Sequence, residues 1–160
     1  GTSSGFATSC GSCKELREAR KAEWYQRGLS AADLALLGTL GSVLPALQKL
    51  YLEEPAAGPD GLKRLAEGLG AGALPAMTFL KLNSMHVGDA SASALAAALG
   101  RGALPRLEWL SLSSTTIGDA GLVALAPALR RLPALEELHL MFNPFGDEGL
   151  VALVAPPPPA

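Results

Sequence analysis

The sequence predicts an α/β solenoid, a stack of similar units that each contribute one short strand and one helix. The dipeptide Leu-Pro recurs at Leu44, Leu74, Leu104 and Leu132, so successive copies lie 30, 30 and 28 residues apart. Each copy opens a segment of regularly spaced leucines: LPALQKLYL, LPAMTFLKL, LPRLEWLSL and LPALEELHL. A turn and a stretch of small and apolar residues with helical spacing follow each segment. Repetition at such a period is typical of solenoids.

The third copy shows how one unit folds. The leucines of residues 107–112 suit a short strand that is buried on one side. Gly118 and Asp119 then form a turn and a helix start, where the Asp carboxylate can cap free N–H groups. The leucines of residues 122–129 form a helical stripe that faces back onto the strand. By the same alignment, the other helices are expected to begin near Asp60, Asp89 and Asp147. One unit cannot bury its own apolar face, whereas stacked units bury it against each other.

The repeated pattern L-x-x-L-x-L, followed by a helix at this period, resembles leucine-rich repeats of the ribonuclease-inhibitor type. The motifs G-A-L-P-x-L and G-D-A-G-L-x-A-L-A also resemble repeat proteins of GC-rich unicellular algae. The resemblance implies a curved solenoid with parallel strands on its concave side and helices on its convex side. Members of this family usually bind other proteins, and some regulate GTPases.

One position departs from the family pattern. An asparagine that commonly bonds neighbouring backbone after the strand occurs here only as Asn143. The equivalent positions hold Pro55, Met85 and Thr115. We therefore expect a looser turn after the strand in the first three copies.

The sequence divides into four parts. We expect a flexible segment over residues 1–11, a helical N-terminal cap over 12–43, the solenoid over 44–155 and a proline-rich tail over 156–160. Four consecutive prolines cannot be helical, so the tail suits a linker or a truncated end, or alternatively a ligand for SH3-like domains. Because the chain starts at Gly1 without Met, we expect a removed leader or a piece of a longer protein.

The expected cap contains two helices. Residues 13–27 predict a charged amphipathic helix, and a second helix begins around Ser30 and Asp33, which have the chemistry of a cap. Trp24 and Tyr25 are expected to pack on this cap rather than to serve function.

Composition excludes several classes of protein. Aromatic residues make up only 5% of a chain that is 49% hydrophobic, so the core must be thin and regular. The net charge of −2 predicts no general attraction to nucleic acid or to anionic membranes. No uninterrupted apolar run has the length of about 18 residues that a membrane span needs. Two cysteines are too few for a disulfide-stapled secreted scaffold, so we expect an intracellular location, cytoplasmic or organellar.

The sequence offers only weak candidates for chemistry. Cys10 and Cys13 form a C-x-x-C pair that could be a redox site or half of a zinc site, but no further ligand lies near them in sequence. We expect this pair to be idle or an incidental disulfide. The acidic pairs 53–54 and 136–137 are interpreted as exposed charges, and His139 as a solvated histidine. We predict no catalytic residues, no cofactor and no small-molecule substrate.

The side chains that alternate with the buried leucines should line the opposite face of the sheet. They fall into three rows, which hold Lys49, Phe79, Trp109 and Glu137; Tyr51, Lys81, Ser111 and His139; and Glu53, Asn83, Ser113 and Met141. The leucine frame is nearly constant from copy to copy, whereas these rows vary. Phe79 and Trp109 should be direct neighbours, and Phe142 should lie beside the rows. An aromatic cluster of this kind predicts a contact surface, unless the terminal segments of the chain fold over it.

The leading hypothesis is therefore a non-enzymatic module that binds a protein or protein complex through this face. Its predicted contact residues are Lys49, Tyr51, Glu53, Phe79, Lys81, Asn83, Trp109, Ser111, Glu137, His139, Met141 and Phe142. A second hypothesis is an accessory subunit held permanently in a larger assembly, with organellar and photosynthetic assemblies included. A redox or metal-binding protein that uses Cys10 and Cys13 is a distant third.

Overall fold

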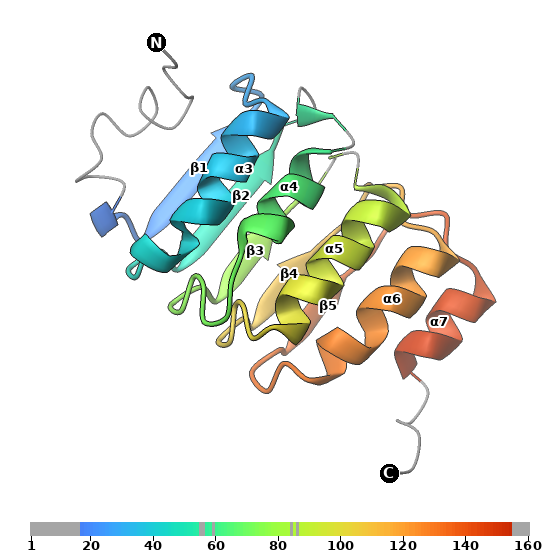
Figure 1. The fold of residues 1–160 in the computed structure, drawn as a ribbon. Helices are drawn as coiled ribbons and strands as arrows, with labels where there is room; N and C mark the ends of the chain where they lie inside the picture. Colours follow the sequence, from blue (N-terminus) through green and yellow to red (C-terminus); the bar gives the residue numbers. More distant parts are fainter. Residues whose placement is uncertain (1–16, 55–56, 59, 84, 86, 155–160) are drawn as a thin grey trace.

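The computed structural model describes residues 17–154 except 55–56, 59, 84 and 86, and it shows five strands alternating with five α-helices (Figure 1). The elements are β1 (Lys21–Tyr25), α3 (Ala31–Thr39), the 3-10 helix η1 (Leu40–Val43), β2 (Lys49–Glu53), α4 (Gly61–Gly68), β3 (Phe79–Lys81), α5 (Gly88–Gly100), β4 (Trp109–Ser111), α6 (Asp119–Arg130), β5 (Glu137–His139) and α7 (Asp147–Val154). The strands form one sheet in the order β1-β2-β3-β4-β5, and every neighbouring pair is parallel. The predicted α/β solenoid is confirmed.

The molecule has two layers. Figure 1 shows helices α3 to α7 side by side on one face of the sheet, and each helix contacts the next. We call one strand with its following helix a coil, and the sheet face turned away from the helices the open sheet face. The hydrophobic core lies between the sheet and the helices.

The leucines form the constant frame of the coils. Strand register aligns Leu50, Leu80, Leu110 and Leu138. The leucines of the Leu-Pro pairs are buried as well, and two of them bond to the preceding coil: Leu74 N–H donates to Gly41 O and Leu104 N–H to Ala73 O, both at 3.0 Å. The predicted equivalence of the repeats is confirmed.

The predicted helix starts are also confirmed, because α4, α5, α6 and α7 all begin within one residue of their repeat aspartates. Asp119 caps a helix as expected, but that helix is not its own helix α6. Its carboxylate caps the next helix in the stack, accepting the N–H groups of Gly146 and Gly149 at 2.7 and 2.8 Å. Asp119 therefore connects two neighbouring coils.

The predicted helix over residues 13–27 is wrong from residue 19 onward, although residues 17 and 18 are helical. Lys21–Tyr25 is a strand, which pairs in parallel with β2 and places Ala22 opposite Leu50 and Trp24 opposite Leu52. Ala22 and Trp24 are buried while the residues between them face outward. This period of two suits a strand, and packing against Leu50 and Leu52 outweighs the helical propensity of the charged residues. The expected cap thus contains a complete fifth coil, β1 with α3.

The turns after the strands are tied more firmly than expected. Glu54, interpreted as an exposed charge, is 1% exposed, and its carboxylate accepts the N–H groups of Arg27, Gly28 and Leu29 at 2.8 to 3.1 Å. Burial of this charge is compensated by three backbone donors at the turn of the preceding coil.

The turn of the third copy is not loose either. Thr115 is fully buried, and its hydroxyl donates to Leu112 O. The Asn143 side chain accepts the N–H groups of Thr115 and Ile117, both at 3.0 Å, and donates to Leu112 O at 2.8 Å. Pro55 lies outside the described residues.

Candidate protein-binding face

Two of the predicted side-chain rows lie on the open sheet face as expected. Register aligns the first row as Lys49, Phe79, Trp109 and Glu137. It aligns the second row as Tyr51, Lys81, Ser111 and His139. The parallel strands therefore carry side chains from sequence positions about 30 residues apart into direct proximity.

Five rings, one from each strand, form a continuous ladder across this face. Phe79 and Trp109 stack with centroids 4.0 Å apart and planes 4° from parallel. Tyr51 lies 4.9 Å from Phe79 on one side, and His139 lies 4.7 Å from Trp109 on the other. Tyr25 extends the series, with its centroid 6.4 Å from that of Tyr51. We call these five residues the ring ladder.

The ring ladder is accessible at every step. Tyr51, Phe79, Trp109 and His139 are partly exposed, and Tyr25 is 38% exposed. Trp24, by contrast, is the one fully buried aromatic side chain among the described residues, and Phe145 packs against the core while partly buried. Most aromatic side chains of the described residues therefore lie on the open sheet face.

Charged side chains accompany the rings. The ammonium of Lys21 lies 5.5 Å from the centroid of Tyr51, and that of Lys49 lies 6.0 Å from Phe79, both within cation–π range. Lys21 also pairs with Glu23 at 2.5 Å, and this hydrogen bond raises the pKa of Lys21 above its usual value. Burial, followed by the nearby Glu23 charge, raises the pKa of Tyr25.

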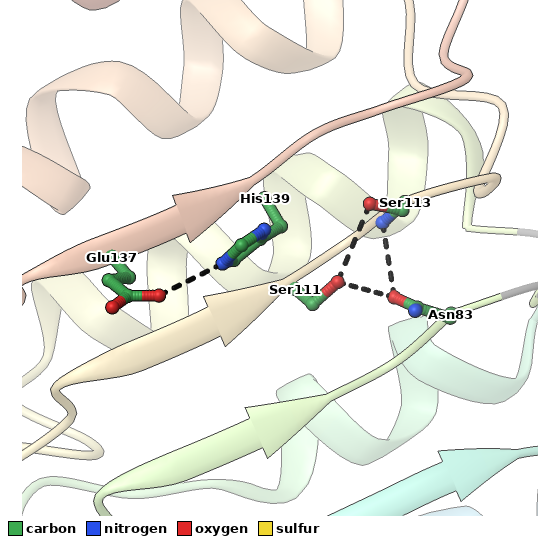
Figure 2. A network of polar contacts seen from close by, with 5 residues as sticks. All are labelled: Asn83, Ser111, Ser113, Glu137 and His139. Carbon is green, nitrogen blue, oxygen red and sulfur yellow. Dashed lines mark hydrogen bonds and ion pairs between the residues drawn. The ribbon is translucent and has the colours of Figure 1, made fainter.

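Asn83 and Ser113 of the third row make hydrogen bonds between neighbouring coils. Figure 2 shows the Asn83 side-chain oxygen accepting the Ser111 hydroxyl at 2.5 Å and the Ser113 N–H at 3.3 Å. Ser111, predicted as a contact residue, is only 2% exposed, because its short side chain lies between Lys81 and His139 in the register. Ser111 and Ser113 therefore hold neighbouring strands together.

The end of the face is more open. Glu137 and His139 pair through Oε2 and Nε2 at 3.1 Å, as Figure 2 shows. Met141 and Phe142 follow β5 and are 58% and 85% exposed. The ring contacts of the described residues run from Tyr25 to His139 and do not reach Phe142, which was expected beside the rows.

Three residues of this face were missed in the sequence. Lys21, Glu23 and Tyr25 of β1 extend it by one strand, and Tyr25 lies on the open sheet face instead of packing on a cap. A signal was present: Ala22 and Trp24 stand 28 residues before Leu50 and Leu52, which is the shorter repeat spacing. The loss of leucine at these positions and the high charge of the segment concealed it.

The structure also bears on metal and membrane chemistry. Among the described residues, no three His, Cys, Asp or Glu side chains lie close enough together to hold a metal ion. Cys10, Cys13 and His86 lie outside the described residues. In the described part of the chain, no helix has the length and apolar character needed to cross a bilayer.

Comparison with known families agrees with this architecture. Residues 106–126 and 132–154 each match the family model described as Leucine Rich repeat. These segments contain β4 with most of α6, and β5 with α7, so the matched repeats coincide with the last two coils. Together with the parallel sheet and its one-sided helices, they define the fold as a leucine-rich-repeat solenoid. No curated protein matches the chain. Leucine-rich repeats generally mediate protein–protein interactions and are typically non-enzymatic.

Proposed function

We propose that this protein is a non-enzymatic interaction module that binds a partner protein through its open sheet face. The observation that carries the proposal is the ring ladder, with the Phe79–Trp109 stack at its centre. Large rings are costly to leave in water and are enriched at the energetic centres of protein interfaces. Their placement on the face, in a protein whose described residues include one fully buried aromatic ring, favours a contact surface.

The arrangement of charge fits a protein partner. Lys49, Lys81 and Glu53 lie beside the rings, so an apolar strip is bordered by groups that can pair or hydrogen-bond. Interfaces commonly combine an aromatic centre with a polar rim. We propose the rings as the anchors and the charged side chains as the determinants of specificity.

A matched pair of photo-crosslinking variants tests the proposal. A photoreactive residue at Lys81, on the open sheet face, should form a defined adduct with a cellular protein. The same residue at Val123, which is exposed on α6, should not form that adduct. The adduct at position 81 should disappear when Trp109 is also replaced by Ala. Equal adducts at both positions, or an adduct indifferent to Trp109→Ala, would contradict the proposal.

Purification of the unmodified protein under stringent washing tests the accessory-subunit alternative. A transient binder is recovered largely free and joins its partner by mass action, whereas an accessory subunit remains bound through stringent washing. Recovery of the unmodified protein in a stable complex, with the ring ladder protected, would favour the permanent assembly.

A further inference from the structure

The middle of the ring ladder presents the edges of its rings, and not their faces, to a partner. Phe79 and Trp109 come from neighbouring strands, and their rings lie within 4° of parallel at a centroid separation of 4.0 Å. Each ring therefore covers one face of the other. Their outer faces are approached by Tyr51 at 4.9 Å and by His139 at 4.7 Å. A flat group such as a nucleic-acid base thus finds no free face between these four rings on which to stack.

The chemistry of ring edges favours a particular contact group. The edge of an aromatic ring is electropositive, whereas its face is electronegative. A group that brings electron density to the edges of Phe79 and Trp109 is therefore preferred there. The face of a partner's aromatic ring does this in the edge-to-face arrangement that aromatic pairs adopt. A ring that lies flat across the Phe79–Trp109 stack also buries apolar area of both rings.

The first row changes charge from one end of the stack to the other. Lys49 precedes Phe79 in the row and Glu137 follows Trp109, so strand register places the stack between a cation and an anion. Among the described residues, Lys49 has no ion pair, and its ammonium lies 6.0 Å from the Phe79 centroid. The Glu137 side chain is 61% exposed, and within the same part of the chain its ion pair is with His139. Both charges are therefore open to a partner.

The other charges on this face do not alter that polarity. Lys21, which extends the first row beyond Lys49, is already paired with Glu23 at 2.5 Å. Lys81 on β3 and Glu53 on β2 lie beside the row, and their opposite charges leave this flank without a net sign. The row therefore presents a cation, an aromatic stack and an anion along one line across the sheet.

The spacing of the row suits an extended polypeptide that crosses the strands. Neighbouring strands lie about 4.8 Å apart, so the three steps from Lys49 to Glu137 cover about 14 Å. An extended chain advances about 3.3 Å per residue, so residues four apart span about 13 Å. Alternate residues of such a chain point to the same side. The residue midway between the two charged positions then lies over the Phe79–Trp109 stack.

We propose that the partner presents an extended segment with an acidic, an aromatic and a basic residue at alternate positions. The acidic side chain pairs with Lys49, and the basic side chain pairs with Glu137. The aromatic ring lies across the edges of Phe79 and Trp109. Either order along the partner's chain satisfies the row, because the segment can cross the strands in either direction. This inference rests on the proposed function and adds the chemistry of the partner to it.

Binding of capped peptides to the full chain tests the inference. The probe is Gly-Glu-Thr-Phe-Thr-Lys-Gly, and its binding is followed through the NMR signal of the Trp109 indole N–H. Two control peptides carry glutamate at both charged positions or lysine at both, and a third carries alanine in place of phenylalanine. The probe should bind about threefold to tenfold more tightly than each control, because each control loses an ion pair or the ring contact.

Charge reversal in the protein gives a matched comparison. Lys49→Glu should weaken binding of the probe about tenfold, because a repulsion replaces an attraction. The same variant should bind the peptide with lysine at both charged positions about as tightly as the unmodified chain binds the probe. Lys63→Glu makes the same change of charge at an exposed position on α4 and should leave the affinity for the probe unchanged.

Equal binding of the probe and the control peptides would overturn the inference, as would equal weakening by Lys49→Glu and Lys63→Glu. The absence of any shift of the Trp109 signal at millimolar probe would overturn it too. In each case, a crosslinked adduct at Lys81 that depends on Trp109 would leave the proposed function standing, whereas the absence of that adduct would remove both. A single-stranded oligonucleotide that shifts the Trp109 signal as strongly as the probe would overturn the inference in favour of nucleic acid.

Discussion

The indole of Trp109 stacks on the ring of Phe79 because β3 and β4 place the two residues directly opposite each other, with ring centroids 4.0 Å apart. The stack is fixed by strand register and does not depend on a loop. Rings held in this way lose little conformational freedom when a partner arrives, and such preorganisation favours affinity. The sheet therefore serves both as scaffold and as the support of the proposed binding face.

The buried carboxylate of Glu54 should be essential for stability. Glu54→Ala leaves three backbone N–H groups at the first turn without their acceptor, so we expect a loss of at least about 2 kcal/mol in the free energy of unfolding. Glu67→Ala, on the exposed side of α4, should change it by less than about 0.5 kcal/mol. Urea unfolding of both variants makes the comparison. Similar midpoints for the two would show that the turn does not need Glu54.

Gly121 and Gly149 donate their N–H groups to the carboxylates of Asp89 and Asp119 at 2.9 and 2.8 Å, and both glycines should resist substitution. Gly121→Ala drives a Cβ to 2.6 Å from Asp89 Oδ1, and we expect a net loss of about 1–3 kcal/mol despite the better helix propensity of alanine. Gly100→Ala is the control, because no atom lies within 4 Å of its added Cβ, and it should be neutral or slightly stabilising. Thermal melts decide between them. A stabilised Gly121→Ala variant would mean that the carboxylate is not held as described.

The cysteine pair should be dispensable for the solenoid. The core that the structure describes is built from residues of Ala22 to Leu132, so Cys10→Ser combined with Cys13→Ser should leave the melting temperature unchanged. Metal analysis of the purified protein should show no loss of bound zinc or iron in the double variant. A large drop in melting temperature, or a metal lost on substitution, would support the redox or metal-binding alternative.

The repeats, the strand register and the helix starts could be predicted because they depend on local spacing. Leu110 and its equivalents recur at fixed distances, and this period alone specifies which residues meet across strands. The position of Trp109 beside Phe79 follows directly from that register. The rows of the proposed binding face were predictable for the same reason.

Features that depend on contacts between coils were harder to predict. β1 carries one alanine and one tryptophan where later strands carry leucines, and only pairing with β2 makes it a strand. Glu54 resembles any exposed glutamate until the turn at Arg27–Leu29 folds against it. Asp119 has the sequence of a helix cap, but the helix that it caps begins about 30 residues later.

The central claim is that Trp109 provides binding area and Leu110 provides core packing, although the two are adjacent. Trp109 is partly exposed, whereas Leu110 is fully buried. Trp109→Ala should therefore reduce the free energy of unfolding by only about 1 kcal/mol, the value of an aromatic stack. Leu110→Ala should reduce it by about 2–5 kcal/mol through a lost core side chain.

The most direct test is urea unfolding of these two variants beside binding of Trp109→Ala to the protein that crosslinks at position 81. We predict that Trp109→Ala stays folded and binds more weakly by about 2 kcal/mol, roughly thirtyfold. If Trp109→Ala unfolds the protein as severely as Leu110→Ala, or if it binds like the unmodified chain, Trp109 is not a binding anchor and the proposed face is wrong.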